Sequence, residues 1–166
     1  TAAHSAIALP DAGLDALTSA ASLGEIGRLK DVAALIQTRI GTLKEAPALV
    51  APFFVGDEDL VVAEEARAGM ADNAADVLDA AIEALEGISD EGYGLLGSES
   101  DWNAERIEAA LRAAIVEGMA IKARFAFGPL RAAVSGARVS PPLFESMEIL
   151  GKHSTLTRLR RLRDGL

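Results

Sequence analysis

A chain of 166 residues, of which 50% are hydrophobic and 4% aromatic, is long enough to bury a core built from Ala, Leu, Ile and Val. It has no cysteine, which excludes disulfides, zinc–thiolate sites and thiol chemistry and favours a reducing, cytoplasmic compartment. No run of about 18 apolar residues and no signal-peptide pattern occurs, so we expect no membrane partner. The chain starts at Thr1 rather than Met, which favours a fragment of a longer protein.

The formal charge is distributed unevenly along the chain. Residues 1–99 carry 5 basic and 18 acidic side chains (−13), residues 100–166 carry 11 and 7 (+4), and the sum is the net charge of −9. The net value alone argues against a nucleic-acid partner, because phosphate binding needs clustered Lys and Arg. The asymmetry predicts an acidic, solvated front half and a back half that faces an anion.

The front of the chain predicts two helices and an apolar plug. Residues 25–40 carry an apolar stripe at helical spacing, and Gly41 ends that helix. Residues 42–45 form a capping-box pattern that opens a short helix ending by Pro52. Residues 53–55 (Phe-Phe-Val) follow, and we interpret them as a core anchor rather than a ligand site.

Two more helices and a linker follow. Residues 56–59 predict a turn that starts a helix running to about Met70, and Asn73 is expected to cap the next helix. Gly87 should end it, after an apolar face made by Val77, Leu78, Ala81, Ile82 and Leu85. Residues 89–100 contain three glycines and no periodicity, which indicates a loop or linker.

The back half shows the same kinds of helix start and stop residues. A helix is expected over residues 104–118, and Gly128-Pro129 starts a short helix that Gly136 ends. Ser140 is expected to cap a further helix, with two prolines in its first turn. The first of these helices is expected to face inward with Ile107, Leu111, Ala114 and Ile115. The last is expected to do so with Leu143, Phe144, Met147 and Leu150.

Gly151 should stop that helix, and a final helix carries Leu156, Leu159 and Leu162 among arginines. No strand pattern of useful length appears. The predicted architecture is therefore all-α, a multi-helical bundle in two consecutive subdomains: residues 1–90, a linker at 91–100, and residues 101–166.

Catalytic patterns are missing. The two histidines, His4 and His153, are far apart, and no pair has metal-ligand spacing. Residues 151–154 (Gly-Lys-His-Ser) lack the first glycine of a phosphate loop. The residues alone thus predict a helical binding or scaffold module.

Several motifs share one resemblance. They are residues 129–136 (PLRAAVSG), 140–152 (SPPLFESMEILGK) and 155–159 (TLTRL), preceded by Asp101-Trp102 and, more thinly, by residues 39–44 (RIGTLK). Together, residues 25–163 resemble the C-terminal region of bacterial-type glutamyl-tRNA synthetases, strongly from Trp102 onward.

The resemblance implies a multi-helical anticodon-binding region, with residues 1–90 as its first subdomain (including a remnant of the preceding connector) and 101–166 as its second. Members of the family join glutamate to its tRNA with ATP. Their ATP and magnesium are handled by an upstream catalytic domain whose two signature motifs do not occur here. We therefore expect a non-catalytic, cytoplasmic, monomeric chain without a cofactor, whose partners are the anticodon arm of glutamate tRNA and that catalytic domain.

Reading an anticodon requires side chains that stack on unpaired bases and hydrogen-bond their edges, which suits arginine. Arg39 lies in the family-like stretch and is the first candidate, although a surface ion pair with a Glu explains it equally well. Lys44 contacts phosphate or only solvates its helix.

Lys122, Arg124 and Arg131 flank Phe125 and Phe127, an arrangement typical of a stacking platform unless both rings are buried.

Arg131 and Lys152 lie in the best-matched motifs, where capping of helix carbonyls, or pairing of Arg131 with Glu145, is the structural alternative. Arg158 and its three neighbouring arginines contact RNA or form a solubilising tail. For the chain as a whole, the alternative to RNA binding is that it acts as a non-catalytic protein-interaction scaffold.

Overall fold

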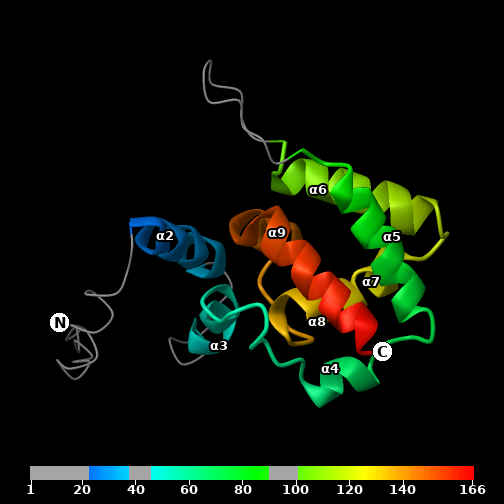
Figure 1. The fold of residues 1–166 in the computed structure, drawn as a ribbon, viewed down its shortest axis with the longest axis horizontal. Helices are drawn as coiled ribbons and strands as arrows, with labels where there is room; N and C mark the ends of the chain where they lie inside the picture. Colours follow the sequence, from blue (N-terminus) through cyan, green and yellow to red (C-terminus); the bar gives the residue numbers. More distant parts are fainter. Residues whose placement is uncertain (1–22, 38–45, 90–100) are drawn as a thin grey trace, which may run out of the picture.

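A computed structural model describes residues 23–37, 46–89 and 101–166, without the side chains of residues 23–26 and 124. No strand occurs within these ranges, which confirms the all-α prediction (Figure 1). In chain order the elements are α2 (Leu23–Gln37), α3 (Ala46–Val50), the 3-10 turn η1 (Ala51–Phe53), α4 (Glu64–Ala68), α5 (Ala74–Glu86), α6 (Ala104–Leu111), its π-helical continuation η2 (Arg112–Glu117), α7 (Ala123–Ala126), α8 (Gly128–Ser135) and α9 (Leu143–Asp164).

Helix α9 is the central element of the core. It packs against α2, α5, α6 and α8, and crosses the middle of the molecule in Figure 1. It buries Leu156, Leu159 and Leu162, as predicted. Each such side chain contributes about 1.5–3 kcal/mol on burial. The opposing face of α5 is the predicted set, all of it buried: Val77, Leu78, Ala81, Ile82 and Leu85.

The core is continuous across the predicted linker. Helix α5 precedes residues 90–100 and α6 follows them, yet α5 packs directly on both α6 and α9. Helices α2 and α3 form a smaller pair at one end, joined to the rest through α9 and η1 (left in Figure 1). The subdomain boundary at 91–100 stays a prediction, and among the described residues it does not separate two cores.

Gly151 interrupts α9. Its backbone (φ 82°, ψ 164°) is not helical, so residues 143–150 and 152–164 form two arms that meet at a kink. A glycine accepts this conformation because it has no Cβ. The predicted stop at Gly151 is therefore confirmed.

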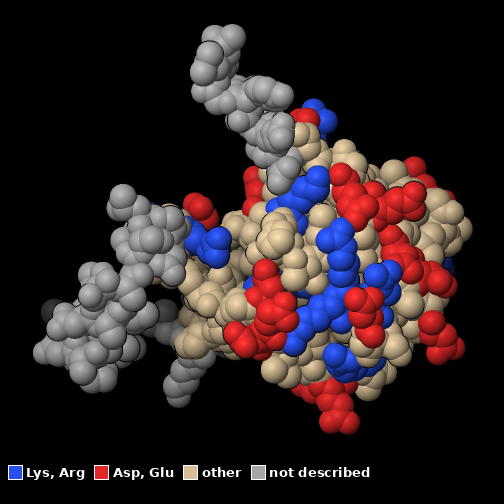
Figure 2. Space-filling model, in the orientation of Figure 1, with Lys and Arg blue, Asp and Glu red and all other residues tan. Residues whose placement is uncertain are grey.

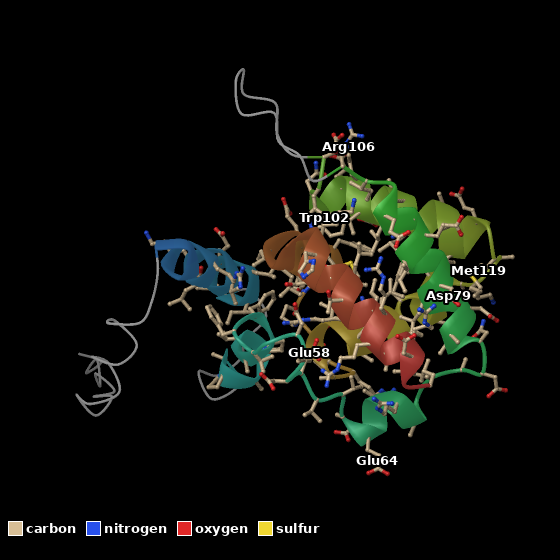
Figure 3. All side chains as sticks on the ribbon, viewed as in Figure 1. Glu58, Glu64, Asp79, Trp102, Arg106 and Met119 are labelled. Atoms are coloured by element: carbon tan, nitrogen blue, oxygen red, sulfur yellow. The ribbon has the colours of Figure 1, made fainter. Side chains whose placement is uncertain are left out.

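Trp102, the single tryptophan of the chain, ties the start of α6 to α9. Its indole Nε1 donates a hydrogen bond to the Met147 carbonyl at 3.0 Å, and the ring is buried (Figure 3). Asn103 then caps α6, because its side-chain oxygen accepts from the Arg106 amide at 3.0 Å.

Tertiary contacts overrule several local expectations. The helix expected from residues 56–59 to Met70 shortens to α4, because the Ala63 amide donates to the Gly136 carbonyl at 2.8 Å and holds the approach to α4 extended. Ser140 does not cap α9. Its hydroxyl donates to the Pro141 carbonyl at 3.1 Å, and Pro142 occupies the N-cap position.

The helix expected over residues 104–118 has the predicted extent, but its second half is a π-helix. The Gly118 amide reaches back five residues to the Ala113 carbonyl at 2.9 Å. Of the Phe-Phe pair, Phe53 is a core residue, whereas Phe54 is 44% exposed. Asn73 occupies the N-cap position of α5 without a side-chain cap bond. The capping box at residues 42–45 lies outside the described residues.

We predict that Gly136→Ala destabilises the protein. Gly136 has a φ of 74°, and a Cβ there would lie 2.5 Å from the Val61 carbonyl oxygen. We expect the free energy of unfolding to fall by about 2 kcal/mol or more, from the left-handed conformation and the clash together. Urea denaturation followed by the fluorescence of Trp102 measures it.

Gly128→Ala is the matched control in the same helix. A Cβ at Gly128 meets nothing within 4 Å, and its φ is not in the left-handed region. Its free energy of unfolding should stay within about 1 kcal/mol of the parent chain. Equal stability of the two variants would contradict the close approach of Val61 to Gly136.

Candidate nucleic-acid interface

The predicted RNA-binding side chains differ in whether the fold already uses them. Those of Lys122, Arg131, Lys152 and Arg158 are described. The other three predictions fall outside the described residues or side chains: Arg39, Lys44 and Arg124.

Arg158 is an internal residue, which corrects its prediction as an RNA contact. Its side chain is only 2% exposed, and Nε donates to the Asp57 carboxylate at 2.6 Å. Nη1 donates to the carbonyls of Pro52 (2.8 Å) and Val134 (2.9 Å), and Nη2 donates to the Val55 carbonyl (3.1 Å). With its donors turned inward, Arg158 is not accessible to a nucleotide.

The basic tail offers no local signal of this burial. Arg158 precedes Leu159 in a run of alternating leucines and arginines, and its acidic partner Asp57 lies 101 residues away in the sequence. Only the fold brings the two together. The result is a clamp that holds the segment after η1 against α8 and α9.

Lys152 has a structural position. Its Nζ donates to the carbonyls of Glu86 (3.0 Å) and Ile88 (2.6 Å), at the C-terminal end of α5. A cation there satisfies open carbonyls and opposes the negative end of the helix dipole. Two of the three ammonium hydrogens are thus used, and a contact between Lys152 and RNA stays a prediction.

Acidic residues of α5 neutralise much of the remaining basic tail. Arg160 pairs with Glu86, and Arg163 pairs with Asp79 and, at 2.6 Å, with Asp164. The hydrogen bond with Asp164, and next the charges of Asp164 and Asp79, raise the pKa of Arg163 above its ordinary value. Figure 2 shows the consequence on this face, where Lys and Arg gather centrally with Asp and Glu on both sides.

The side chains of Lys122 and Arg131, in contrast, are not engaged by the part of the fold that the structure describes. Lys122 is exposed and Arg131 half-buried, and neither side chain donates to an acceptor among the described residues. Phe125 lies within one turn of Lys122, since its amide donates to the Lys122 carbonyl at 2.8 Å, and its side chain is 61% exposed. We group Lys122 and Phe125, at the first turn of α7, with Arg131 of the following helix α8 and call these three residues the α7 surface.

The two rings of the predicted stacking platform lie in different environments, and the platform itself stays a prediction. Phe127 is buried and packs edge-on against Phe144, with ring centroids 5.3 Å apart, so it belongs to the core. Phe125 is 61% exposed and lies three residues after the exposed Lys122. An exposed ring next to cations suits a single-stranded base, which stacks on the ring while its phosphate meets the charge.

No group of three or more His, Asp or Glu side chains that could hold a metal ion occurs in the part of the chain that the structure describes. None of the helices that the structure describes has the length and apolar composition needed to cross a membrane.

The family model for the anticodon binding domain matches residues 14–163. The chain belongs to this anticodon-binding domain family. The match spans both halves of the chain, including the front half, where the motifs resemble the family less closely. It therefore confirms the relationship predicted from the motifs of the back half.

Relatives within the family are glutamate–tRNA ligases. One from Kineococcus radiotolerans is 50% identical over 139 residues, which are 84% of this chain and 26% of that protein. One from Arthrobacter sp. is 50% identical over 135 residues, 81% of this chain and 25% of that protein. The chain thus spans about a quarter of the length of the curated relatives it matches.

A solved structure has the same fold. It is a glutamate tRNA ligase from Elizabethkingia meningosepticum in complex with its amino acid, with a TM-score of 0.71 and 18% identity. The alignment covers 95% of this chain and 28% of that one. The fold of this anticodon-binding domain therefore persists where most side chains differ.

We predict that Arg158→Gln destabilises the domain. It leaves the Asp57 carboxylate and three carbonyls without their donor, and breaking one side of a buried ion pair costs about 3–5 kcal/mol. Because the Asp57 side chain is 20% exposed, we expect a loss of about 3 kcal/mol in the free energy of unfolding. Urea denaturation measures it.

Arg160→Gln is the control, because it breaks an ion pair whose side chains are 46% and 49% exposed. It should cost less than about 1 kcal/mol. If both substitutions cost the same, Arg158 does not act as a clamp.

Proposed function

We propose that this chain is the anticodon-binding module of a glutamate–tRNA ligase, the enzyme that joins glutamate to its tRNA with ATP. The observation that carries the proposal is the family match over residues 14–163, together with about 50% identity to glutamate–tRNA ligases over most of the chain. The matched region is about a quarter of those ligases. The chemistry of the reaction then belongs to the remaining three quarters of such an enzyme.

The α7 surface is the part of the described structure that best suits an unpaired nucleotide. Phe125 supplies an exposed ring, and the side chains of Lys122 and Arg131 supply cations that form no ion pair among the described residues. A base stacked on an aromatic ring gains about 1–3 kcal/mol. Arg39, Lys44 and Arg124 stay predicted contributors to the same RNA contact.

The acidic composition does not oppose this proposal. Several carboxylates of the front half, including Asp57, Asp79 and Glu86, are already paired with arginines of α9. Their repulsion of a phosphate backbone is reduced accordingly. The binding energy then depends on a few cations and one ring, so we expect modest affinity and a shallow dependence on salt.

For the parent ligase we further propose the catalytic domain of the same chain as a partner, ATP and magnesium as its requirements, and action as a cytoplasmic monomer. The support is again the length of the ligase relatives outside the matched region. We expect no cofactor to bind to the residues of this chain.

The proposed function predicts selective tRNA binding. Titration with glutamate tRNA and with an unrelated tRNA, at about 0.1 M salt, should show tighter binding of glutamate tRNA that weakens as salt rises. Phe125→Ala should weaken glutamate tRNA binding about tenfold, because it removes the stacking ring. Lys122→Gln should lower the salt slope by about 0.7, the value for one contact with a single strand.

Arg112→Gln is the matched control. Arg112 is exposed like Lys122, but it pairs with Glu108 at 2.6 Å on η2. It should leave both affinity and salt slope unchanged. The proposed function fails if neither tRNA binds at tens of micromolar, and the α7 surface fails if Phe125→Ala and Arg112→Gln bind alike.

A further inference from the structure

A pocket of about 390 Å³ opens between α4, the segment that precedes it and the C-terminal arm of α9. Its wall carries three guanidinium groups, from Arg67, Arg158 and Arg161, and one carboxylate, from Asp57. Aliphatic side chains, among them Val61, line the rest. Nothing in the sequence pattern indicates this pocket, because Arg67 and Arg161 are 94 positions apart.

Two of the arginines at the pocket form no ion pair with a carboxylate of the described residues; Glu58 and Asp164 share a neighbouring hollow with Arg161 but do not pair with it. Arg158 is paired with Asp57, so these two cancel. Arg67 donates only to the Gly165 carbonyl, at 3.2 Å. Arg161 donates only to backbone carbonyls as well, at 2.8 and 3.0 Å. Four other arginines are held by carboxylates instead: Arg106, Arg112, Arg160 and Arg163.

The two arginines also keep donors to spare. A guanidinium has five N–H groups in a planar fork, and the carbonyl bonds of Arg67 and Arg161 both use Nη1. Nε and Nη2 of each remain. Because the carbonyls already hold both side chains in place, an anion that binds between them loses little further side-chain freedom.

We propose that this pocket binds a phosphate group. Two guanidinium forks match a phosphate in charge and in the geometry of its oxygens. The volume exceeds that of a bare ion, and the aliphatic wall suits the sugar or other carbon framework attached to the phosphate. The group comes either from an RNA backbone or from a free phosphate compound. The pocket shares no lining residue with the α7 surface, and its proposal does not depend on that surface.

Val61 allows a test that leaves both arginines untouched. It lines the pocket and is 81% exposed, so a substitution there does not disturb the core. Val61→Glu places a negative charge at the rim, and Val61→Gln is the uncharged control. Ala109→Glu adds the same charge on exposed Ala109 of α6, away from the pocket.

The measurement is a titration with inorganic phosphate, followed by the NMR signals of the arginine Nε–H groups. We expect phosphate to shift the signals of Arg67 and Arg161, and to leave that of Arg112 in place. Val61→Glu should weaken the binding about fivefold, through repulsion of the anion. Val61→Gln and Ala109→Glu should bind like the parent chain. Unshifted signals from Arg67 and Arg161, or equal binding by Val61→Glu and Ala109→Glu, overturn the proposal.

A second arm identifies the source of the phosphate. If it is an RNA backbone, Val61→Glu also weakens glutamate tRNA binding, and inorganic phosphate competes with the tRNA. If it is a free phosphate compound, tRNA binding is unchanged in Val61→Glu, whereas binding of inorganic phosphate is still weakened about fivefold. The Phe125→Ala variant should keep the phosphate shifts, so failure of the α7 surface and failure of the pocket are distinguishable.

Discussion

The hydrogen bonds of the buried Arg158 guanidinium link the front half of this domain to its back half. The guanidinium reaches an acidic residue 101 positions earlier and three carbonyls on two separate segments. Removing a charge from water is costly, and it is tolerated here because each donor finds an acceptor. No buried side-chain nitrogen or oxygen among the described residues lacks a partner. One side chain thereby holds the segment after η1 against α8 and α9.

The same pairing resolves the charge asymmetry of the chain. The acidic front and the basic back are not two separate surfaces, because Asp57, Asp79 and Glu86 meet arginines of α9. Most of the conspicuous basic tail therefore stabilises the fold and is not presented to a ligand. The cations that remain available to an anion are fewer than the sequence suggests, and they lie at particular positions. They include Lys122 and Arg131, at α7 and α8, and Arg67 with Arg161 at the pocket beside α4.

This distribution explains how an acidic domain in an RNA-related family can still be suited to RNA. An affinity that rests on a few unneutralised cations and one exposed ring depends on their positions more than on net charge. Helices α5, α6, α8 and α9 pack continuously, and α7, which carries Phe125, contacts α8. The front helices α2 and α3 are attached to this group of helices through α9 and η1.

The sequence by itself determined the helical class, the family and most helix ends. Periodic leucines and isoleucines bury one face whatever their surroundings, and Gly136 and Gly151 end helices through local backbone geometry. Tertiary structure alone decided which cations are free. Whether an arginine is buried, as Arg158 is, or lines a pocket, as Arg67 is, depends on acceptors remote in the sequence. The residues next to an arginine in the sequence do not indicate those acceptors, because only the packing of the helices brings the acceptors within hydrogen-bond distance of the arginine.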